Sequence, residues 1–324
     1  MWLEDKSLAP PLIVCVSANP ALDRRLRFRS LRLGDVMRAE SVEAFAGGKA
    51  AHVALAAHAL GTQAIWLGFL GGATGDEFIS NMKTSGIDFI HVRTRKPTRM
   101  NLELLEKSGR ITEMLEPGEP PTASELREMV LTLAKGLRRK WRHAFVVVSG
   151  SLPRGVPANF YAQLISAARS LGARVFLDAS GEALHVGLAA EPEFVKPNLA
   201  EIEALLDRRL KTRKAIAAAA RELVRRGAES AAISLGAEGL VWLERPDGPV
   251  WHARPPRLTG VSTVGNGDAT VAGFVLAAAR GLSGEAAVRL ATACGAANTL
   301  AASPGRISVQ DVKRLIPRVT VQKA

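Results

Sequence analysis

The sequence predicts an α/β protein with a mostly parallel central sheet, and three observations support this fold class. Short apolar runs alternate along the chain with segments of helical periodicity. Repeated strand–helix order of this kind is typical of a parallel sheet covered by helices on both faces. Aromatic residues make up only 5% of the chain and 29 residues are glycine, which favours close helix–sheet packing over an aromatic-rich β-sandwich. The 324 residues suffice for one large domain or two smaller ones.

Each expected element has its own local signal. The first buried strand is the apolar run 12–17, and the helix 49–60 stops at Gly61. The capping box of Thr122 and Glu125 opens a long helix toward Trp141. The same criteria predict strands at 64–70, 87–92, 144–148, 174–177, 194–195 and 231–235, and helices at 77–84, 158–171, 199–206 and 213–226.

Two segments, Asp23–Phe45 and Met100–Leu115, interrupt this order with strand-like patterning and no helix between the strands. In the second, Ser108 and Gly109 form the turn of an expected hairpin. These segments predict a small second sheet that projects from the main one as a lid, over about 23–45 and 93–116. Because an isolated small sheet buries little surface, we expect the lid to pair with a second subunit in a homodimer.

The formal net charge of +12 permits nucleic acid, an anionic membrane surface or an anionic small substrate as the partner. The excess charge lies in separate clusters, several of them at the ends of predicted helices, where cations complement the helix dipole. The chain has no aromatic-rich platform or RNA-binding motif, so a nucleic-acid partner is not expected. The clusters are Arg24-Arg25, Arg138–Arg142, Arg208-Arg209 and Arg225-Arg226.

The two cysteines, Cys15 and Cys294, lie far apart in apolar segments and are expected to be buried free thiols. No apolar run reaches the length of a membrane span, and the run 12–16 is too short for a signal peptide. The sequence therefore predicts a cytoplasmic protein without a membrane partner.

The segment Val264–Phe274 carries the strongest chemical signal. Gly265 and Gly267 flank Asn266, Asp268 follows at once, and a helix-forming run comes next. Glycines let backbone N–H groups approach a phosphate, and a helix N-terminus adds partial positive charge there. A carboxylate in the first turn can accept a proton from an attacking hydroxyl. The alternative is a glycine turn with an aspartate cap, which is common before helices.

Three further motifs follow predicted strands or precede predicted helices. Gly47-Gly48-Lys49 allows close backbone approach to a ligand, although it lacks the spacing of a Walker A loop and also fits a plain turn into a helix. Ser149–Pro153 follows a strand at the edge where open α/β sheets bind ligands. Ser234–Gly239 ends another strand and could cradle a nucleotide.

Lys196-Pro197-Asn198 is followed by Glu201, three residues after the asparagine and on the same face of the helix. A carboxylate there could hold Mg²⁺ through water, because Mg²⁺ usually keeps several waters. Alternatively, Asn198 is only an N-cap and Glu201 its capping-box partner.

Taken together and in this order, these motifs resemble the ribokinase-like (pfkB-type) carbohydrate kinases, from about Leu12 to Leu315. The start of the chain and the Ser149–Pro153 motif look most like the branch with 1-phosphofructokinase, tagatose-6-phosphate kinase and the minor 6-phosphofructokinase. The resemblance implies one three-layer α/β/α domain over 1–324 with a small β-sheet lid. The motifs that carry it are Asn19–Asp23, Gly47–Lys49, Gly75–Phe78, Ser149–Pro153, Lys196–Asn198 with Glu201, and Gly265–Asp268.

The resemblance also implies residue roles. Asp268 is the base for the sugar hydroxyl, and the N–H groups of Gly265, Asn266 and Gly267 form the anion hole for the transferred phosphoryl group. Such donors are typically worth about 10²–10³ in rate each. Glu201 organises Mg²⁺ through water, and K⁺ is a further ion that the resemblance leaves open. The residues expected to bind ATP are Lys196, Asn198, Ser234, Gly236, Gly239 and, at the adenine, Asn298.

For the sugar, the resemblance places Arg99 at the substrate phosphate, with Lys49 nearby; the planar fork of arginine can bind two phosphate oxygens. The substrate-binding residues implied are Asp23, Gly47, Gly48, Lys49, His52, Arg99, Asn101 and Ser151.

This chain departs from the family pattern within the first helix. The usual Gly-Gly-Lys-Gly-x-Asn becomes Gly-Gly-Lys-Ala-Ala-His, so His52 replaces an asparagine that contacts sugar hydroxyls. The histidine changes the donor geometry and introduces pH sensitivity, unless it is only a packing residue. Asn266 stands where the family has Ala or Ser, which is tolerable because backbone N–H groups bind the phosphoryl group.

The sequence therefore predicts ATP- and Mg²⁺-dependent phosphorylation of a phosphorylated ketohexose, such as fructose 1-phosphate, fructose 6-phosphate or tagatose 6-phosphate. One alternative is a kinase for an unphosphorylated sugar or nucleoside. A more distant one is a non-catalytic regulator that binds a sugar or nucleotide.

Overall fold

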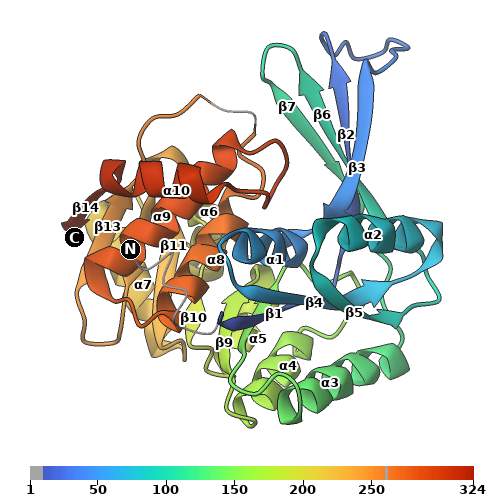
Figure 1. Ribbon diagram of the computed structural model, residues 1–324. Helices are drawn as coiled ribbons and strands as arrows, with labels where there is room; N and C mark the ends of the chain where they lie inside the picture. Colours follow the sequence, from blue (N-terminus) through green and yellow to red (C-terminus); the bar gives the residue numbers. More distant parts are fainter. Residues whose placement is uncertain (1–9, 260–261) are drawn as a thin grey trace.

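The computed structural model describes residues 10–259 and 262–324, and its central sheet is mostly parallel as predicted (Figure 1). The strands of this sheet are β1 (Leu12–Ser17), β4 (Gln63–Leu70), β5 (Asp88–Arg93), β8 (Phe145–Ser149), β9 (Arg174–Asp178), β10 (Phe194–Val195), β11 (Ser230–Ser234), β12 (Leu240–Leu243), β13 (Val250–Arg254) and β14 (Thr320–Lys323). Their order across the described sheet is β14-β13-β12-β11-β10-β9-β8-β1-β4-β5. Neighbours from β11 to β5 pair in parallel, whereas β12, β13 and β14 add antiparallel strands at one edge.

Helices cover both faces of the sheet and form two hydrophobic cores. One face carries α1 (Lys49–Ala59), α2 (Gly72–Ser85), α8 (Asn266–Ala279), α9 (Gly284–Leu300) and α10 (Val309–Leu315). The other carries α3 (Ala123–Arg138), α4 (Phe160–Arg169), α5 (Gly181–Leu188), α6 (Leu199–Leu206) and α7 (Arg213–Arg225). Along β1, Ile13 and Cys15 enter the first core, while Val14 and Val16 enter the second. This double burial explains why the strand is apolar from Leu12 to Val16.

Most predicted elements are present, with small shifts at their ends. Strands 12–17 and 194–195 and helix 199–206 have the predicted bounds. The capping box of Thr122 and Glu125 is formed. Helix α2 begins at Gly72 rather than residue 77, because its first turn is rich in glycine and lacks the apolar periodicity on which the prediction depended.

Several elements were not predicted. Helix α9 is buried along most of its length, so it has no polar stripe to mark its periodicity. The sequence patterns also did not predict two short helices, α5 and α10, or the antiparallel edge strands β12, β13 and β14. Cys15 and Cys294 are buried free thiols, as expected. No helix in the described part of the chain is long and apolar enough to cross a bilayer.

The predicted lid is a second sheet that projects from the body of the molecule (Figure 1). Its strands are β2 (Ala21–Phe28), β3 (Ser41–Gly47), β6 (Arg99–Glu106) and β7 (Ile111–Leu115), in the order β3-β2-β6-β7. The predicted hairpin turn is present, with Gly109 at a φ of 87°. Arg93 still belongs to the main sheet, so the second lid segment starts at Arg99 rather than near residue 93. The single-domain organisation over 1–324 remains a prediction.

Candidate active site

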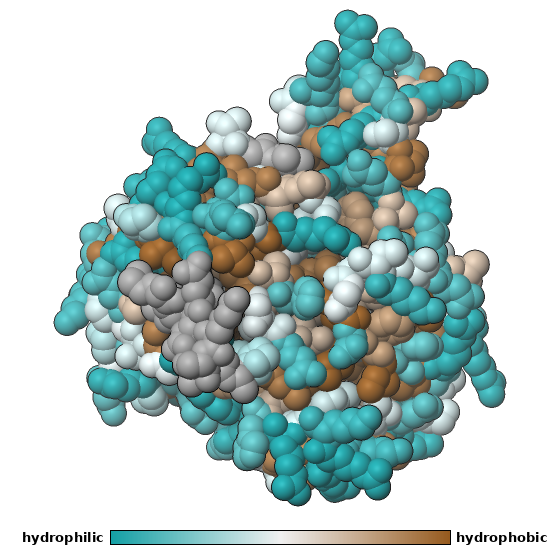
Figure 2. Space-filling model, viewed as in Figure 1, coloured by the Kyte–Doolittle hydropathy of each residue, from teal (hydrophilic) through white to brown (hydrophobic). Residues whose placement is uncertain are grey.

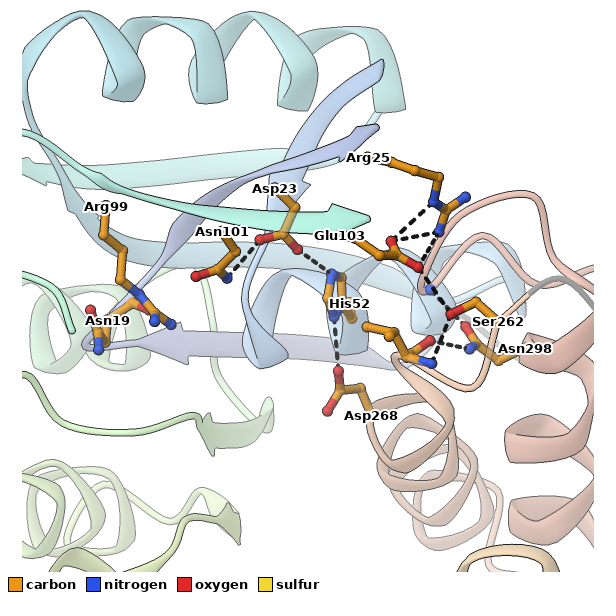
Figure 3. Close-up of polar contacts among 12 residues, drawn as sticks. Asn19, Asp23, Arg25, His52, Arg99, Asn101, Glu103, Ser262, Asp268 and Asn298 are labelled. Atoms are coloured by element: carbon orange, nitrogen blue, oxygen red, sulfur yellow. Dashed lines mark hydrogen bonds and ion pairs between the residues drawn. The ribbon is translucent and has the colours of Figure 1, made fainter. Parts of the chain in front are cut away.

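The predicted site residues meet at one edge of the central sheet. The carboxyl ends of parallel strands all open toward this edge, which is where open α/β folds bind ligands. Strands β8, β9 and β11 end there with Ser149, Asp178 and Ser234, and Lys196 directly follows β10. The N-termini of α1 and α8 and the base of the lid complete it (Figure 3).

Helix α8 begins at the predicted glycine segment. Gly265 has a φ of 83°, and a Cβ on it would lie 2.9 Å from Pro304 Cβ, so only glycine fits. The N–H of Asn266 donates to Thr263 O at 3.2 Å. The N–H groups of Gly267 and Asp268 have no acceptor among the described residues, and such groups at a helix N-terminus attract anions. Of the three predicted donors, only the N–H of Asn266 is already engaged by a described residue, and the N–H of Asp268 is available in addition.

Asn298 supports this segment from below. The residue is buried, and its amide nitrogen donates to Val264 O at 2.7 Å and to Asn266 Oδ1 at 2.8 Å. Its oxygen accepts from the N–H of Gly305 at 2.8 Å. The place of Asn298 in an adenine site stays a prediction. In the structure, both the nitrogen and the oxygen of its amide form hydrogen bonds with the glycine segment and Gly305.

Asp268 lies in the first turn of α8 and contacts His52 of α1. The distance from His52 Nδ1 to Asp268 Oδ2 is 2.9 Å, and the distance from His52 Nε2 to Asp23 Oδ2 is 3.3 Å (Figure 3). Asp23 also accepts a hydrogen bond from Asn101 Nδ2 at 2.8 Å. The expected base and two expected sugar ligands are therefore joined through His52.

Gly47 makes room for Asp23. A Cβ on Gly47 would lie 2.0 Å from Asp23 Cγ, which no side chain could tolerate. Gly48 follows as the N-cap of α1 with a φ of 84°. Gly47 thus allows the carboxylate of Asp23 to pack against the chain just before α1 begins, and Gly48 supplies the positive φ of the cap.

Four charged side chains form a second cluster at the same edge. Asp178 is buried and lies 3.7 Å from Lys49 Nζ and 3.5 Å from Lys196 Nζ. Lys49 Nζ is also 3.8 Å from Glu201 Oε1. Burial alone would raise the pKa of Asp178, but the ammonium groups of Lys196 and Lys49 outweigh this and lower it. The negative charge of Asp178, against the effect of burial, raises the pKa of Lys49, so Asp178 and Lys49 face each other as an ion pair at neutral pH.

Two of these positions bear on the predictions. Lys49, expected near the substrate phosphate, contacts Asp178 and Glu201, on the side of the predicted ATP and metal ligands. Lys196 points toward the start of α8, because a Cβ on Gly267 would lie 3.3 Å from Lys196 Nζ. The ammonium of Lys196 is thus directed at the predicted anion hole.

Asn198 and Glu201 form the capping box that was the alternative interpretation. The Asn198 side chain accepts from the N–H of Glu201 at 2.9 Å, and Glu201 Oε2 accepts from the N–H of Asn198 at 2.8 Å. No cluster of three or more His, Cys, Asp or Glu side chains that could hold a metal occurs among the described residues. A Mg²⁺ ion nevertheless fits, since it commonly binds through one carboxylate, waters and nucleotide phosphates, and Glu201 Oε1 accepts no hydrogen bond from the cap.

The predicted nucleotide loop follows β11. A β-bridge joins Asn198 to Ser234, so two predicted ATP ligands lie side by side. Gly236 and Gly239 have positive φ angles of 60° and 88°, and a Cβ on Gly239 would lie 1.9 Å from Ala253 O. The loop conformation therefore depends on these glycines.

A family model for pfkB carbohydrate kinases matches residues 13–310. The chain belongs to the pfkB carbohydrate kinase family. It is therefore a sugar kinase, a phosphotransferase with an alcohol group as acceptor. The arrangement of a base, a helix N-terminus and a cationic cluster at one sheet edge fits phosphoryl transfer.

The pfkB relatives cover most of the chain. A 1-phosphofructokinase from Xanthomonas campestris is 37% identical, over 95% of this chain and 97% of the relative, and one from Vibrio cholerae is 34% identical over 88% of each. Among solved structures, phosphofructokinase-2 from Escherichia coli in complex with fructose-6-phosphate aligns with a TM-score of 0.86, 30% identity and coverage of 96% and 99%. The same enzyme in complex with potassium aligns with a TM-score of 0.87, at the same identity and coverage.

In this pfkB kinase, Arg99 starts lid strand β6 and lies beside the end of β1. Its guanidinium donates to Asn19 O at 3.1 Å and to Glu116 O at 2.7 Å. Asn19 in turn donates to Ser151 Oγ at 3.2 Å, which brings the predicted sugar ligands Arg99 and Ser151 to one place. Arg99 and Asn19 line a small hollow of about 30 Å³.

Three charged residues at or near the candidate site were not predicted from the sequence. Asp178 ends β9 at the ligand-binding edge, and an aspartate directly after a buried strand was a usable signal. Arg25 and Glu103 form a buried ion pair between lid strands, with Nη2 and Oε2 2.9 Å apart. Because Arg25 was grouped with surface charges, only the pairing of β2 with β6 reveals its partner.

Proposed function

We propose that this kinase transfers the terminal phosphoryl group of ATP to a hydroxyl of a phosphorylated ketohexose: fructose 1-phosphate, fructose 6-phosphate or tagatose 6-phosphate. The observation that carries the proposal is the position of Asp268. Its carboxylate lies at the N-terminus of α8, beside unpaired N–H groups, and is joined through His52 to Asp23. A base for the sugar hydroxyl and donors for the moving phosphoryl group are thus adjacent.

Each group has a defined task in this proposal. Asp268 accepts the proton of the attacking hydroxyl as the oxygen approaches the phosphorus. The N–H groups of Gly267 and Asp268 and the ammonium of Lys196 stabilise the charge on the phosphoryl oxygens. Asn198, Ser234, Gly236 and Gly239 form the nucleotide side of the site. Mg²⁺, held by Glu201 through water, would neutralise phosphate charge when ATP is bound.

Two observations support a phosphorylated sugar. Arg99 lies at the sugar end of the site, where its fork could bind two phosphate oxygens. The curated relatives are named 1-phosphofructokinase, and a solved relative holds fructose-6-phosphate. The competing proposal is a kinase for an unphosphorylated sugar or nucleoside. It is supported by the hydrogen bonds that the Arg99 guanidinium already donates to the backbone carbonyls of Asn19 and Glu116.

The proposal includes a homodimer formed through the lid, in the cytoplasm and without a nucleic-acid or membrane partner. Figure 2 shows hydrophobic residues among hydrophilic ones on the visible side of the lid. The lid strands and the loop between β2 and β3 expose large apolar side chains, namely Leu33, Val36, Val42, Met114 and Leu115. Such residues on one projecting sheet favour a covering partner. A monomer in sedimentation at micromolar concentration would contradict this part.

The decisive experiment is a coupled ADP-release assay with Mg·ATP, a panel of ketohexose phosphates and the matching free sugars. Turnover on one phosphohexose would support the proposal and identify the substrate. Turnover on free sugars alone would favour the competing proposal and mean that Arg99 has another task. Parallel assays in KCl and NaCl test for a potassium requirement, because a solved structure of the E. coli relative is a complex with potassium.

A further inference from the structure

His52 bridges two carboxylates that come from different parts of the fold. It lies in the first turn of α1 and is 4% exposed. Nδ1 is 2.9 Å from Asp268 of α8, and Nε2 is 3.3 Å from Asp23 of lid strand β2 (Figure 3). The imidazole therefore links the lid, the first helix and the catalytic helix at one point.

The two neighbouring carboxylates favour a positively charged ring. An ionised carboxylate only accepts hydrogen bonds, and a neutral imidazole has a single N–H donor. Nδ1 is hydrogen-bonded to Asp268, and Nε2 faces Asp23 at an ion-pair distance without a hydrogen bond, so a ring protonated at both nitrogens suits the two carboxylates best. Burial alone would lower the pKa of His52, but its hydrogen bonds and ion pairs with Asp23 and Asp268 raise it to about 10.

Few other charges face the ring. Glu113 of β7 lies within the influence of His52, Asp23 and Asp268, and burial raises its pKa. Lys49 begins the same helix, but its ammonium is paired with Asp178 and Glu201. Strands β1, β4 and β8, which pack against α1, have no charged side chain, and Glu43 of β3 is exposed and paired with Arg27. The two aspartates are therefore the main partners of His52.

We propose that His52 is a positioning residue of the phosphoryl transfer: as an imidazolium it holds the base Asp268 and the sugar-binding carboxylate Asp23 in one fixed arrangement. This inference rests on the proposed function. Since Oδ2 of Asp268 is bound to His52, the other oxygen is left to receive the substrate proton. The contact of Nε2 with Asp23 is an ion pair at 3.3 Å without a hydrogen bond, so it is the positive charge of the imidazolium that holds this second carboxylate.

The first test observes the bridge without any substrate. In protein with ¹⁵N-labelled histidine rings, NMR at pH 8 should show one imidazolium with both nitrogens protonated, which is absent from His52→Asn. Asp23→Asn and Asp268→Asn should each lower the pH at which this ring loses its proton. A singly protonated His52 ring at pH 8 would overturn the proposal.

The second test measures positioning. His52→Asn should lower kcat by about 100-fold, because small misplacement of reacting groups is costly, and leave KM for ATP unchanged. His58→Asn, on the same helix but exposed, should match the wild type. Loss of thermal stability with unchanged kcat would mean that the bridge is only structural. If no sugar is phosphorylated at all, the proposed function fails, while the NMR result still decides whether the bridge exists.

Discussion

Arg25 of lid strand β2 and Glu103 of lid strand β6 form a buried ion pair that connects the lid to the segment before helix α8. Arg25 Nε and Nη2 lie 3.0 Å and 2.9 Å from Glu103 Oε2. Glu103 Oε1 accepts from Ser262 Oγ at 3.1 Å, and Ser262 accepts from the N–H of Val264 at 3.1 Å, directly before the anion hole (Figure 3). Arg25 also donates to Ala302 O. The lid thus contacts both the segment that precedes α8 and the segment that follows α9 in the chain.

Removing one member of this pair should be strongly destabilising. Glu103→Ala leaves the buried guanidinium of Arg25 without a counter-charge, and we expect a loss of about 3–5 kcal/mol in the free energy of unfolding. Urea denaturation measures it. The double variant Arg25→Met/Glu103→Leu removes both charges at once, so its loss in the free energy of unfolding should be much smaller.

The neighbouring pair of Arg24 and Glu77 is the matched control. Both side chains are more than one third exposed, so Arg24→Ala should cost less than about 1 kcal/mol. Equal effects of Arg24→Ala and Glu103→Ala would contradict the special role given to the buried pair.

Asp268→Asn should lower kcat by at least about a thousandfold, because the amide cannot accept the hydroxyl proton. The N–H groups of α8 stay in place, so ATP affinity should change little. Steady-state kinetics and calorimetric titration of ATP measure the two quantities. A decrease of less than tenfold in kcat would remove Asp268 from the role of base.

Arg99→Ala should raise KM for a phosphohexose sharply, because a bidentate phosphate contact is lost. KM for ATP should not change, since the nucleotide residues lie at the ends of other strands. Comparison of the phosphohexose with its free sugar is the control: equal effects on both would place Arg99 outside the phosphate site.

The pH dependence of stability should report His52. Its pKa is about 10 in the folded protein and 6.5 in its ordinary state, so the folded chain holds the proton more tightly than the unfolded chain. This contribution is fully present below pH 6.5 and is lost as the pH rises toward 10. Urea midpoints between pH 6.5 and 10 should therefore fall more steeply for the wild type than for His52→Asn. Parallel curves would contradict the raised pKa.

Local determinants explain why the sequence located the helix starts at which the candidate site residues lie. Gly265 and Asp268 lie in one turn, and Asn198 and Glu201 in another, so spacing alone placed them. The roles of Asp178, Arg25 and Glu103 depend on partners brought together by the fold. Spacing along a chain does not encode such contacts. The same limit explains why His52 was identified as a departure, but its bridge between two aspartates was not foreseen.

Asn298 gives the sharpest contrast between a predicted role and an observed position. A residue that lines the adenine site should affect KM for ATP when it is removed. The structure instead connects the Asn298 amide to Val264, Asn266 and Gly305, which fixes the segment that presents the anion hole. We therefore expect Asn298→Ala to lower kcat by about 10²-fold, as displaced donors no longer meet the phosphoryl oxygens.

In that variant KM for ATP should remain within a factor of about three, because the expected change falls on the transition state rather than on the bound nucleotide. Asn298→Asp is the matched variant: it keeps the oxygen that accepts from Gly305 but loses both donated bonds, so kcat should fall with it as well. Steady-state kinetics at saturating sugar separate the two roles. A rise in KM for ATP with kcat unchanged would instead place Asn298 at the adenine.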